Sequence, residues 1–88
     1  MKLNTMFETM ELDDQFIAIP VSEKGQTYSG VIKLNDTGAF ILKLLKEEVS
    51  EEDIVHAISE EYDAPKEQIS ADVHQFVDAF RMKGFLEE

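Results

Sequence analysis

The apolar residues of the first 34 positions occur in short groups that are separated by turn signals. Asp13 and Asp14 form one such signal, and the polar stretch 22–26 around Gly25 forms another. Because strands joined by short turns normally pair side by side, we expect an antiparallel meander whose third strand lies at an edge. The predicted strands are at about 6–12, 16–21 and 28–34.

After residue 34 the apolar spacing becomes that of amphipathic helices. Asn35 or Asp36 can cap a first helix by accepting a backbone N–H bond, and Ser50 can cap a second. A third helix ends at Gly84, a residue type common just after helix ends. The first predicted helix extends from its cap to about residue 47, and the second extends from Ser50 to about residue 62. The third begins between residues 65 and 70 and ends at Gly84.

The order of three strands followed by three helices, without an internal repeat or a linker, predicts one α+β domain over residues 1–88. A chain of this length can bury roughly 60–65% of the surface that its unfolded form exposes. That is enough for one core but leaves little room for an elaborate active site. Phe85 and Leu86, which follow the last helix, are expected to fold back onto this core.

The sequence argues against nucleic-acid partners by its charge and against a membrane by its lack of a long apolar run. Nineteen acidic and eight basic side chains give a formal net charge of -11, which repels phosphate. The absence of cysteine excludes disulfides, thiolate metal sites and a cysteine nucleophile. With neither a signal-peptide pattern nor a run of membrane-spanning length, a cytoplasmic protein is expected.

The sequence contains few residues that could take part in catalysis or bind a metal. His56 and His74 each have a carboxylate four residues on, Glu60 and Asp78, which is compatible with a metal or acid–base site but more typical of pairing on exposed helix surfaces. The sequence contains no recognisable nucleophile with an activating base and no phosphate-binding glycine loop. We therefore expect a protein that is not an enzyme and that has no cofactor or metal.

The predicted third strand has few of the prolines, bulges or inward-pointing charges that usually keep an edge strand from pairing with another chain. Ile32 and Leu34 share one face, and Val31 and Lys33 share the other, so one side can pack on the core. An edge strand has unpaired backbone groups, which either its own chain covers or an extended peptide uses by adding a strand. The residues alone leave both alternatives open.

Three segments together resemble the PqqD-like proteins. They are "KLNDTGAFILKLL", "SEEDIVHAISEEYD" and "ISADVHQFVDAFRMKGFLEE", which carry an asparagine-capped join of strand to helix, a short second helix and an Asp-Val-x-x-Phe helix ending in Gly-aromatic-Leu. The resemblance covers about residues 6–86. The chain departs from the family in "KEEVSEED", where many relatives have an acidic residue and glycine before the helix cap.

This resemblance implies a winged-helix-like domain that binds the leader segment of a ribosomally made precursor peptide as an added strand. It also implies that the domain presents the leader to a modifying enzyme, commonly a radical S-adenosylmethionine enzyme. On a helical wheel, Asp72, Gln75 and Ala79 lie on one flank of the third helix, and Ser70, His74 and Arg81 lie on the other. The family match at Asp72 favours the first flank as the one that borders the bound peptide. Phe80 is assigned to the core. The expected peptide-binding residues are Ser29, Gly30, Val31, Ile32 and Lys33 on the third strand and Asp72, Gln75, Phe76 and Ala79 on the third helix.

The main alternative is a winged helix-turn-helix transcriptional regulator, in which the third helix would enter a DNA groove. That helix holds Asp72 and Asp78 and lacks a cluster of Arg, Asn and Gln for reading base edges. A homodimer is also open, because two bare strand edges can pair between protomers.

Overall fold

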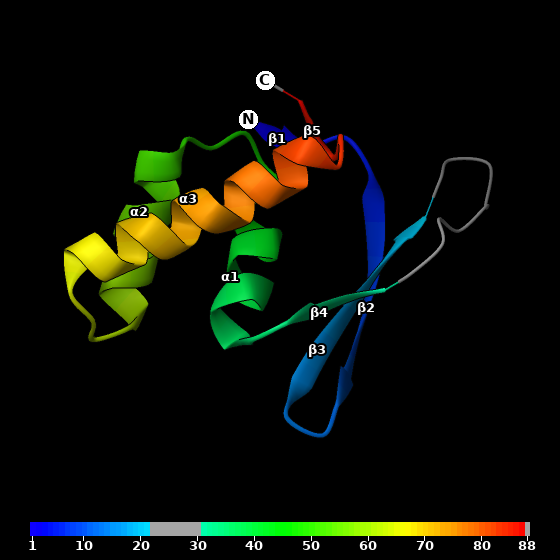
Figure 1. The fold of residues 1–88 in the computed structure, drawn as a ribbon, viewed down its shortest axis with the longest axis horizontal. Helices are drawn as coiled ribbons and strands as arrows, with labels where there is room; N and C mark the ends of the chain where they lie inside the picture. Colours follow the sequence, from blue (N-terminus) through cyan, green and yellow to red (C-terminus); the bar gives the residue numbers. More distant parts are fainter. Residues whose placement is uncertain (22–30, 88) are drawn as a thin grey trace.

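The computed structural model describes residues 1–21 and 31–87. Strands β2 (Met6–Leu12), β3 (Gln15–Val21) and β4 (Ile32–Leu34) form an antiparallel sheet in the order β2-β3-β4. Asp13 has φ 55° in the turn between the first two strands, a left-handed conformation that Asp tolerates. The predicted meander, with its third strand at an edge, is confirmed (Figure 1).

Three helices follow, and together with the sheet they confirm the α+β class. They are α1 (Asp36–Leu44), α2 (Glu51–Glu61) and α3 (Lys66–Met82). Asn35 is the cap of α1, since its Oδ1 accepts a bond of 2.7 Å from the Gly38 amide. Ser50 caps α2 in a reciprocal pair: its Oγ accepts from the Asp53 amide at 3.1 Å, and the Asp53 carboxylate accepts from the Ser50 amide at 3.0 Å.

The first helix is shorter than expected. The prediction extended it to residue 47, whereas α1 ends at Leu44. The next turn is tighter, because Lys46 and Glu47 donate to carbonyls three residues back, at 3.3 and 3.2 Å. At the end of α3, Gly84 has φ 78°, and its amide donates to the Arg81 carbonyl at 3.0 Å, which confirms the predicted stop.

The third strand is also shorter than expected in the part that can be compared. The prediction covered 28–34, but β4 begins at Ile32, which lies opposite Ala18. Val31 directly precedes the strand, and residues 28–30 lie outside the described part of the chain. The pattern of apolar residues could not place this boundary because Val31 fits the alternation equally well.

A second, two-stranded sheet was not predicted. It pairs β1 (Lys2–Leu3) with β5 (Leu86–Glu87) and brings the two ends of the described chain together, as Figure 1 shows. Strands of two residues show no periodicity, so pattern reading cannot detect them. Phe85 and Leu86 are half-buried against the core, which confirms that this segment folds back.

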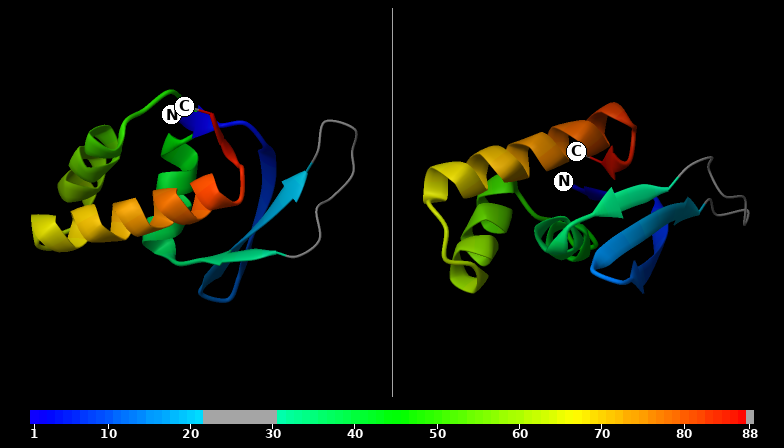
Figure 2. Two further views of the ribbon diagram at one scale, coloured as in Figure 1. Left: turned by 45° about the horizontal axis from the view of Figure 1, so that its top comes forward. Right: turned by 60° about the horizontal axis from the view of Figure 1, so that its bottom comes forward.

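The helices all lie on one side of the three-stranded sheet (Figures 1 and 2). One buried cluster holds the helices together, centred on Ile41, Leu45, Ile54, Ile58, Val73 and Val77. A second cluster joins the sheet to α1 and α3 and consists of Ala18, Leu34, Leu42 and Phe80. None of the helices in the described residues is both long and apolar enough to cross a membrane.

Candidate functional site

The strand β4 is one edge of the sheet. Its pairs with β3 are Phe16 with Leu34, Ile17 with Lys33, and Ala18 with Ile32. Within residues 1–21 and 31–87, no strand pairs with the other side of β4. The backbone groups that face that side can therefore form a ladder with an added strand.

The side chains of β4 alternate as expected. Leu34 is buried and Ile32 is half-buried against the second core cluster, whereas Lys33 is exposed and Val31 is 55% exposed. Packing on one face fixes the strand while its edge stays open. Of the five expected strand residues, Ile32 and Lys33 lie in β4 and Val31 precedes it, whereas Ser29 and Gly30 lie outside the described residues.

A groove of about 320 Å³ lies between α3 and the start of α1, where β4 runs into the helix. All four residues expected on α3 line this groove, so the structure brings them together on the flank of the helix that carries Asp72. The lining residues are Asp72, Gln75, Phe76 and Ala79 from α3, and Asn35, Thr37, Gly38 and Ile41 from the opposite wall.

The floor of the groove is apolar and held in place by core packing. The Phe76 ring stacks on Phe80 with centroids 4.4 Å apart, and Phe80 itself is 3% exposed. Phe80 in turn contacts Phe7 and Phe85, with centroids 5.8 and 5.7 Å away. Because these aromatic contacts restrict Phe76, the floor is largely formed before any ligand arrives.

Gly38 lies in the wall of the groove that α1 forms, where there is little room for a side chain. A Cβ at this position would lie 3.2 Å from the Asn35 Oδ1 and 3.3 Å from a Leu34 methyl carbon, which is closer than ordinary contact. A larger residue would therefore disturb the cap of α1 and the end of β4 together. The close join between strand and helix depends on this glycine.

The rim of the groove is polar. Asn35, Thr37 and Gln75 offer hydroxyl and amide groups, and Asp72 supplies a carboxylate. An apolar floor with a polar rim beside an open strand edge can hold an extended peptide: the backbone pairs with β4, and alternate side chains enter the groove. The geometry therefore offers a binding surface for a linear peptide.

The sequence did not identify the wall formed by residues 35–41. Asn35 was recognised only as a cap and Ile41 only as an apolar helix position, because no spacing relates this segment to residues 72–79. The signal that could have identified it is the "KLNDTGAF" segment, since a strand that enters a helix without a loop places the helix start beside the strand edge.

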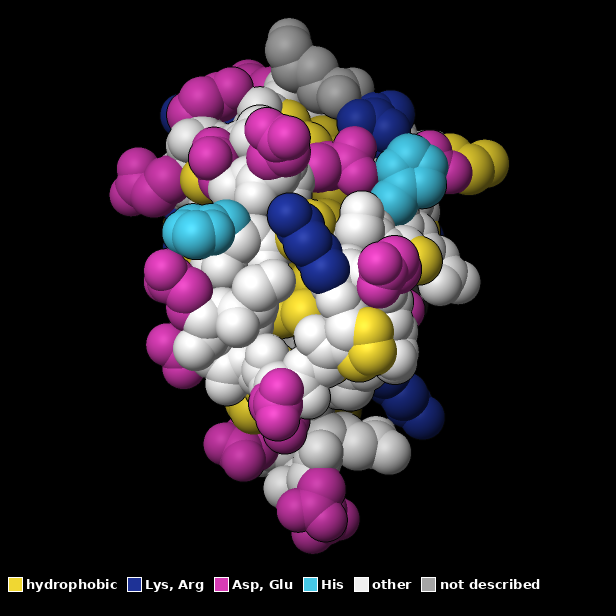
Figure 3. Space-filling view, turned by 90° about the vertical axis from the view of Figure 1, so that its left-hand side faces the viewer, with side chains coloured by type: hydrophobic (Ala, Val, Ile, Leu, Met, Phe, Trp, Pro, Cys, Tyr) yellow, Lys and Arg dark blue, Asp and Glu magenta, His cyan; other side chains and the backbone are white. Residues whose placement is uncertain are grey.

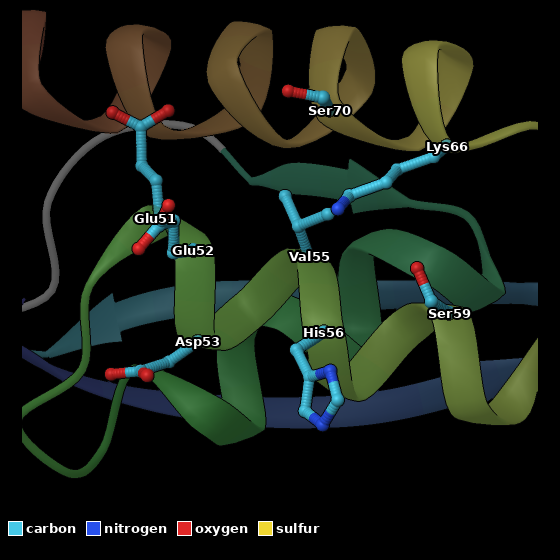
Figure 4. A pocket seen from close by; sticks show the side chains of 8 residues that line it. All are labelled: Glu51, Glu52, Asp53, Val55, His56, Ser59, Lys66 and Ser70. Carbon is cyan, nitrogen blue, oxygen red and sulfur yellow. The ribbon is translucent and has the colours of Figure 1, made fainter.

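A second hollow, of about 580 Å³, lies between α2 and α3. Figure 4 shows Lys66 reaching from the start of α3 over Val55 of α2, with Glu51, Glu52 and Asp53 on the first turn of α2. Its lining residues come from α2 and the first turns of α3, none of them belongs to β4, and most carry charged or hydroxyl groups. Unlike the groove beside β4, it is lined by no aromatic side chain other than the imidazole of His56.

One of the two expected histidine pairs is wrong. His56 pairs with Glu60 as predicted, at 3.2 Å, and both side chains are exposed. His74 instead lies 3.1 Å from Glu51 of α2, while Asp78 pairs with Arg81 at 3.6 Å. Spacing along one helix cannot detect the carboxylate that a neighbouring helix brings closer. In the described residues, no cluster of three or more His, Asp or Glu side chains could hold a metal ion.

The face over α2 and α3 is strongly acidic, as Figure 3 shows. The carboxyl of Asp53 has a pKa below its ordinary value, mainly because the Ser50 backbone amide and hydroxyl stabilise the charged form by hydrogen bonds. Among the described residues, no polar or charged side chain is buried. The titratable groups of this part of the chain therefore lie in contact with water.

Comparisons with known proteins agree with this geometry. Residues 18–86 match the family model of coenzyme PQQ synthesis protein D (PqqD). A similar solved structure is TbiB1 in complex with the TbiA(beta) leader peptide, which is 28% identical, covers 99% of this chain and 95% of its own, and has a TM-score of 0.71. Lasso peptide synthetase B1 complexed with the leader peptide, at 18% identity, 100% coverage of both chains and a TM-score of 0.65, shares the fold.

No curated protein sequence matches the chain. The family match nonetheless spans most of the chain, from the middle of β3 through the groove and α3 to β5. The chain belongs to the PqqD family.

Proposed function

We propose that this protein is a non-catalytic adaptor that binds the leader segment of a ribosomally made precursor peptide and presents it to an enzyme. The observation that carries this proposal is the open β4 edge next to a groove with an apolar floor and a polar rim. Both similar structures are complexes with leader peptides, and the first shares 28% of its sequence with this chain. Family membership supports the same role.

The leader lies along β4 as a fourth strand. Its backbone pairs with the edge groups of Val31, Ile32 and Lys33, and the expected contacts with Ser29 and Gly30 fall on residues outside the described part of the chain. Side chains that point toward α3 contact Phe76 and Ala79, while Asp72 and Gln75 bind polar groups at the rim. Main-chain pairing supplies affinity for any extended segment, and the groove selects among sequences.

The partner enzyme is of the radical S-adenosylmethionine type, as the PqqD family implies. The adaptor itself needs no catalytic residue, since its contribution is to raise the local concentration of the precursor at the enzyme. Two copies that paired through their β4 edges would occupy the groups that the leader needs. A homodimer of this kind therefore belongs to the state without leader.

A DNA-binding role has less support. The exposed residues of α3 include Glu67, Asp72 and Asp78, and the whole chain has a net charge of -11. A recognition helix needs basic residues to neutralise phosphates and amide or guanidinium groups to read bases. The three acids of α3 outnumber its two bases, and together with the charge of the whole chain they oppose contacts with phosphates.

Ala79→Leu tests the groove, with Ala71→Leu as its matched control. Both alanines are exposed on α3, but only Ala79 lines the groove beside β4. The added side chain at residue 79 fills space that the leader uses, so we expect the dissociation constant to rise about tenfold or more. Ala71→Leu should leave it unchanged.

The probe is the N-terminal half of a short peptide encoded beside this chain, labelled for fluorescence anisotropy. Helical content measured by circular dichroism checks that both variants fold. If Ala79→Leu and the wild type bind this peptide equally well, the groove is not the binding site. If the wild type binds no neighbouring peptide at millimolar concentration, the proposed function is wrong.

A further inference from the structure

Three of the four outward-facing side chains of β2 are large, apolar and exposed; the fourth is Glu8. Phe7 turns inward, where its ring contacts Phe80 and Phe85, so residues of the opposite parity turn away from the helices. Met6, Met10 and Leu12 are accordingly 75%, 50% and 53% exposed. In a soluble chain, such a row of large apolar side chains on one strand needs an explanation.

The neighbouring strands continue this surface. Met6 pairs with Val21 and Met10 with Ile17, which in turn lies opposite Lys33 of β4. The helices lie on the other side of the sheet (Figures 1 and 2). We call the resulting surface the outer face, and it consists of Met6, Met10, Leu12, Ile17, Ile19, Val21 and Val31.

The outer face extends across β2 and β3 to Val31, which directly precedes β4. Strands of seven residues and an inter-strand spacing of about 4.8 Å give it a length of roughly 24 Å and a width of roughly 10 Å between strand axes. None of its members belongs to the two buried clusters of the described residues. Its area, on the order of a few hundred Å², is comparable to that of the largest apolar patch on a typical monomer, and such patches are often functional.

Charge argues against a second copy as the occupant. One acid, Glu8, and one base, Lys33, lie on the same side of the sheet as the outer face, so this side is close to neutral. The whole chain, however, has a net charge of -11, and two copies would repel each other as they approach. A partner with a less acidic surface does not meet this repulsion.

Position favours a partner that acts on the bound peptide. Val31 belongs to the outer face and Lys33 lies beside it, and these two residues alternate along the chain with Ile32 and Leu34 of the inner face. A leader strand added at the β4 edge would extend the sheet, so every second leader side chain would join the outer face. The protein and its leader would then form one continuous surface.

We infer that the outer face docks the enzyme that acts on the bound precursor, through a flat apolar surface on that enzyme, and that the leader strand enlarges the contact. This inference rests on the proposed leader binding. It implies that leader and enzyme bind cooperatively, because each strengthens the binding of the other by the same factor. The adaptor thereby distinguishes a loaded from an unloaded state.

Met10→Lys tests this inference, with Met82→Lys as the matched control. Both methionines are exposed, at 50% and 83%, so neither substitution empties the core. Met82 ends α3, away from the outer face. A lysine at residue 10 places a charge inside the apolar contact, and we expect the affinity for the enzyme to fall about tenfold or more. Met82→Lys should change it less than twofold.

The enzyme used is the radical S-adenosylmethionine enzyme encoded beside this chain, titrated with and without saturating leader peptide by biolayer interferometry. Leader affinity is measured separately by anisotropy. Weaker enzyme binding in Met10→Lys, with leader affinity unchanged, supports the inference. Equal enzyme binding by Met10→Lys and the wild type overturns it while the proposed leader site stands.

Two further outcomes are distinguishable. If the wild type does not bind the leader at all, the proposed function fails first, and the inference fails with it. If sedimentation shows a wild-type dimer that Met10→Lys dissociates and the leader does not, the outer face is a contact between two copies, and the enzyme is not its occupant.

Discussion

Two phenylalanines on α3 illustrate what single positions reveal. Phe76 and Phe80 lie on one apolar stripe, yet Phe80 is 3% exposed in the core, whereas Phe76 stacks on it and lines the groove. The stripe was readable from the sequence, and the assignment of Phe80 to the core is confirmed. The assignment of Phe76 to peptide binding stays a prediction.

His74 shows where reading single positions fails. Its spacing predicted Asp78 as partner, but Glu51 of another helix lies 3.1 Å away. Contacts between elements depend on how helices cross, and a sequence pattern within one helix contains no information about that crossing. The groove wall at residues 35–41 was missed for the same reason.

Asp53 gives a prediction about pH. Because its folded-state pKa is lowered, its charged form contributes stability above its ordinary pKa, and this contribution is lost as pH falls through the lower, folded value. We expect Asp53→Asn to melt at a lower temperature than the wild type at pH 7. The difference should shrink as the pH drops below about 4.

Thermal melts followed by circular dichroism at pH 7, 5, 4 and 3 measure this difference. Glu52→Gln, on the same exposed helix turn, serves as a control for loss of one negative charge at the start of α2. A difference between wild type and Asp53→Asn that stays constant down to pH 3 would show that the hydrogen bonds to Ser50 do not depend on the carboxylate charge.

At the scale of elements, the residues that begin and end helices were more informative than the periodicity of apolar residues. The caps at Asn35 and Ser50 and the stop at Gly84 were predictable, because each residue type satisfies a specific need of a helix end. The two-residue strands β1 and β5 were not, since they form only when distant parts of the chain have already folded. The edge position of β4 followed from strand order alone.

Substitutions at the two helix caps distinguish an effect on stability from an effect on leader binding. Asn35→Ala and Ser50→Ala each remove a side-chain acceptor for a helix-end amide, and we expect each to cost about 1 kcal/mol in the free energy of unfolding. Only Asn35 also lines the groove beside β4. Asn35→Ala should therefore weaken leader binding, and Ser50→Ala should not.

Urea unfolding measures the first quantity, and fluorescence anisotropy at a temperature where both variants are folded measures the second. Asn35→Ser restores an acceptor at the cap and should recover most of the lost stability. Equal loss of leader affinity in Asn35→Ala and Ser50→Ala would mean that binding follows general stability and not the groove.

At the scale of the whole molecule, the fold separates three surfaces. The β4 edge and its groove lie where the sheet meets α1 and α3, the outer face lies on the side of the sheet without helices, and the acidic surface of α2 and α3 lies elsewhere (Figures 1 and 3). Net charge and strand order were readable from the sequence. The outer face became visible only when the register set Met10 beside Ile17.

The central claim is that a leader peptide binds at β4 and its groove, and backbone amide chemical shifts test it most directly. In a titration of isotopically labelled protein with the leader peptide, we expect shifts at Ile32–Leu34 and at Asp72, Gln75, Phe76 and Ala79. Amides that line the second hollow, such as those of His56 and Ser59, should not move. Shifts confined to that hollow between α2 and α3, with β4 unchanged, would contradict the account.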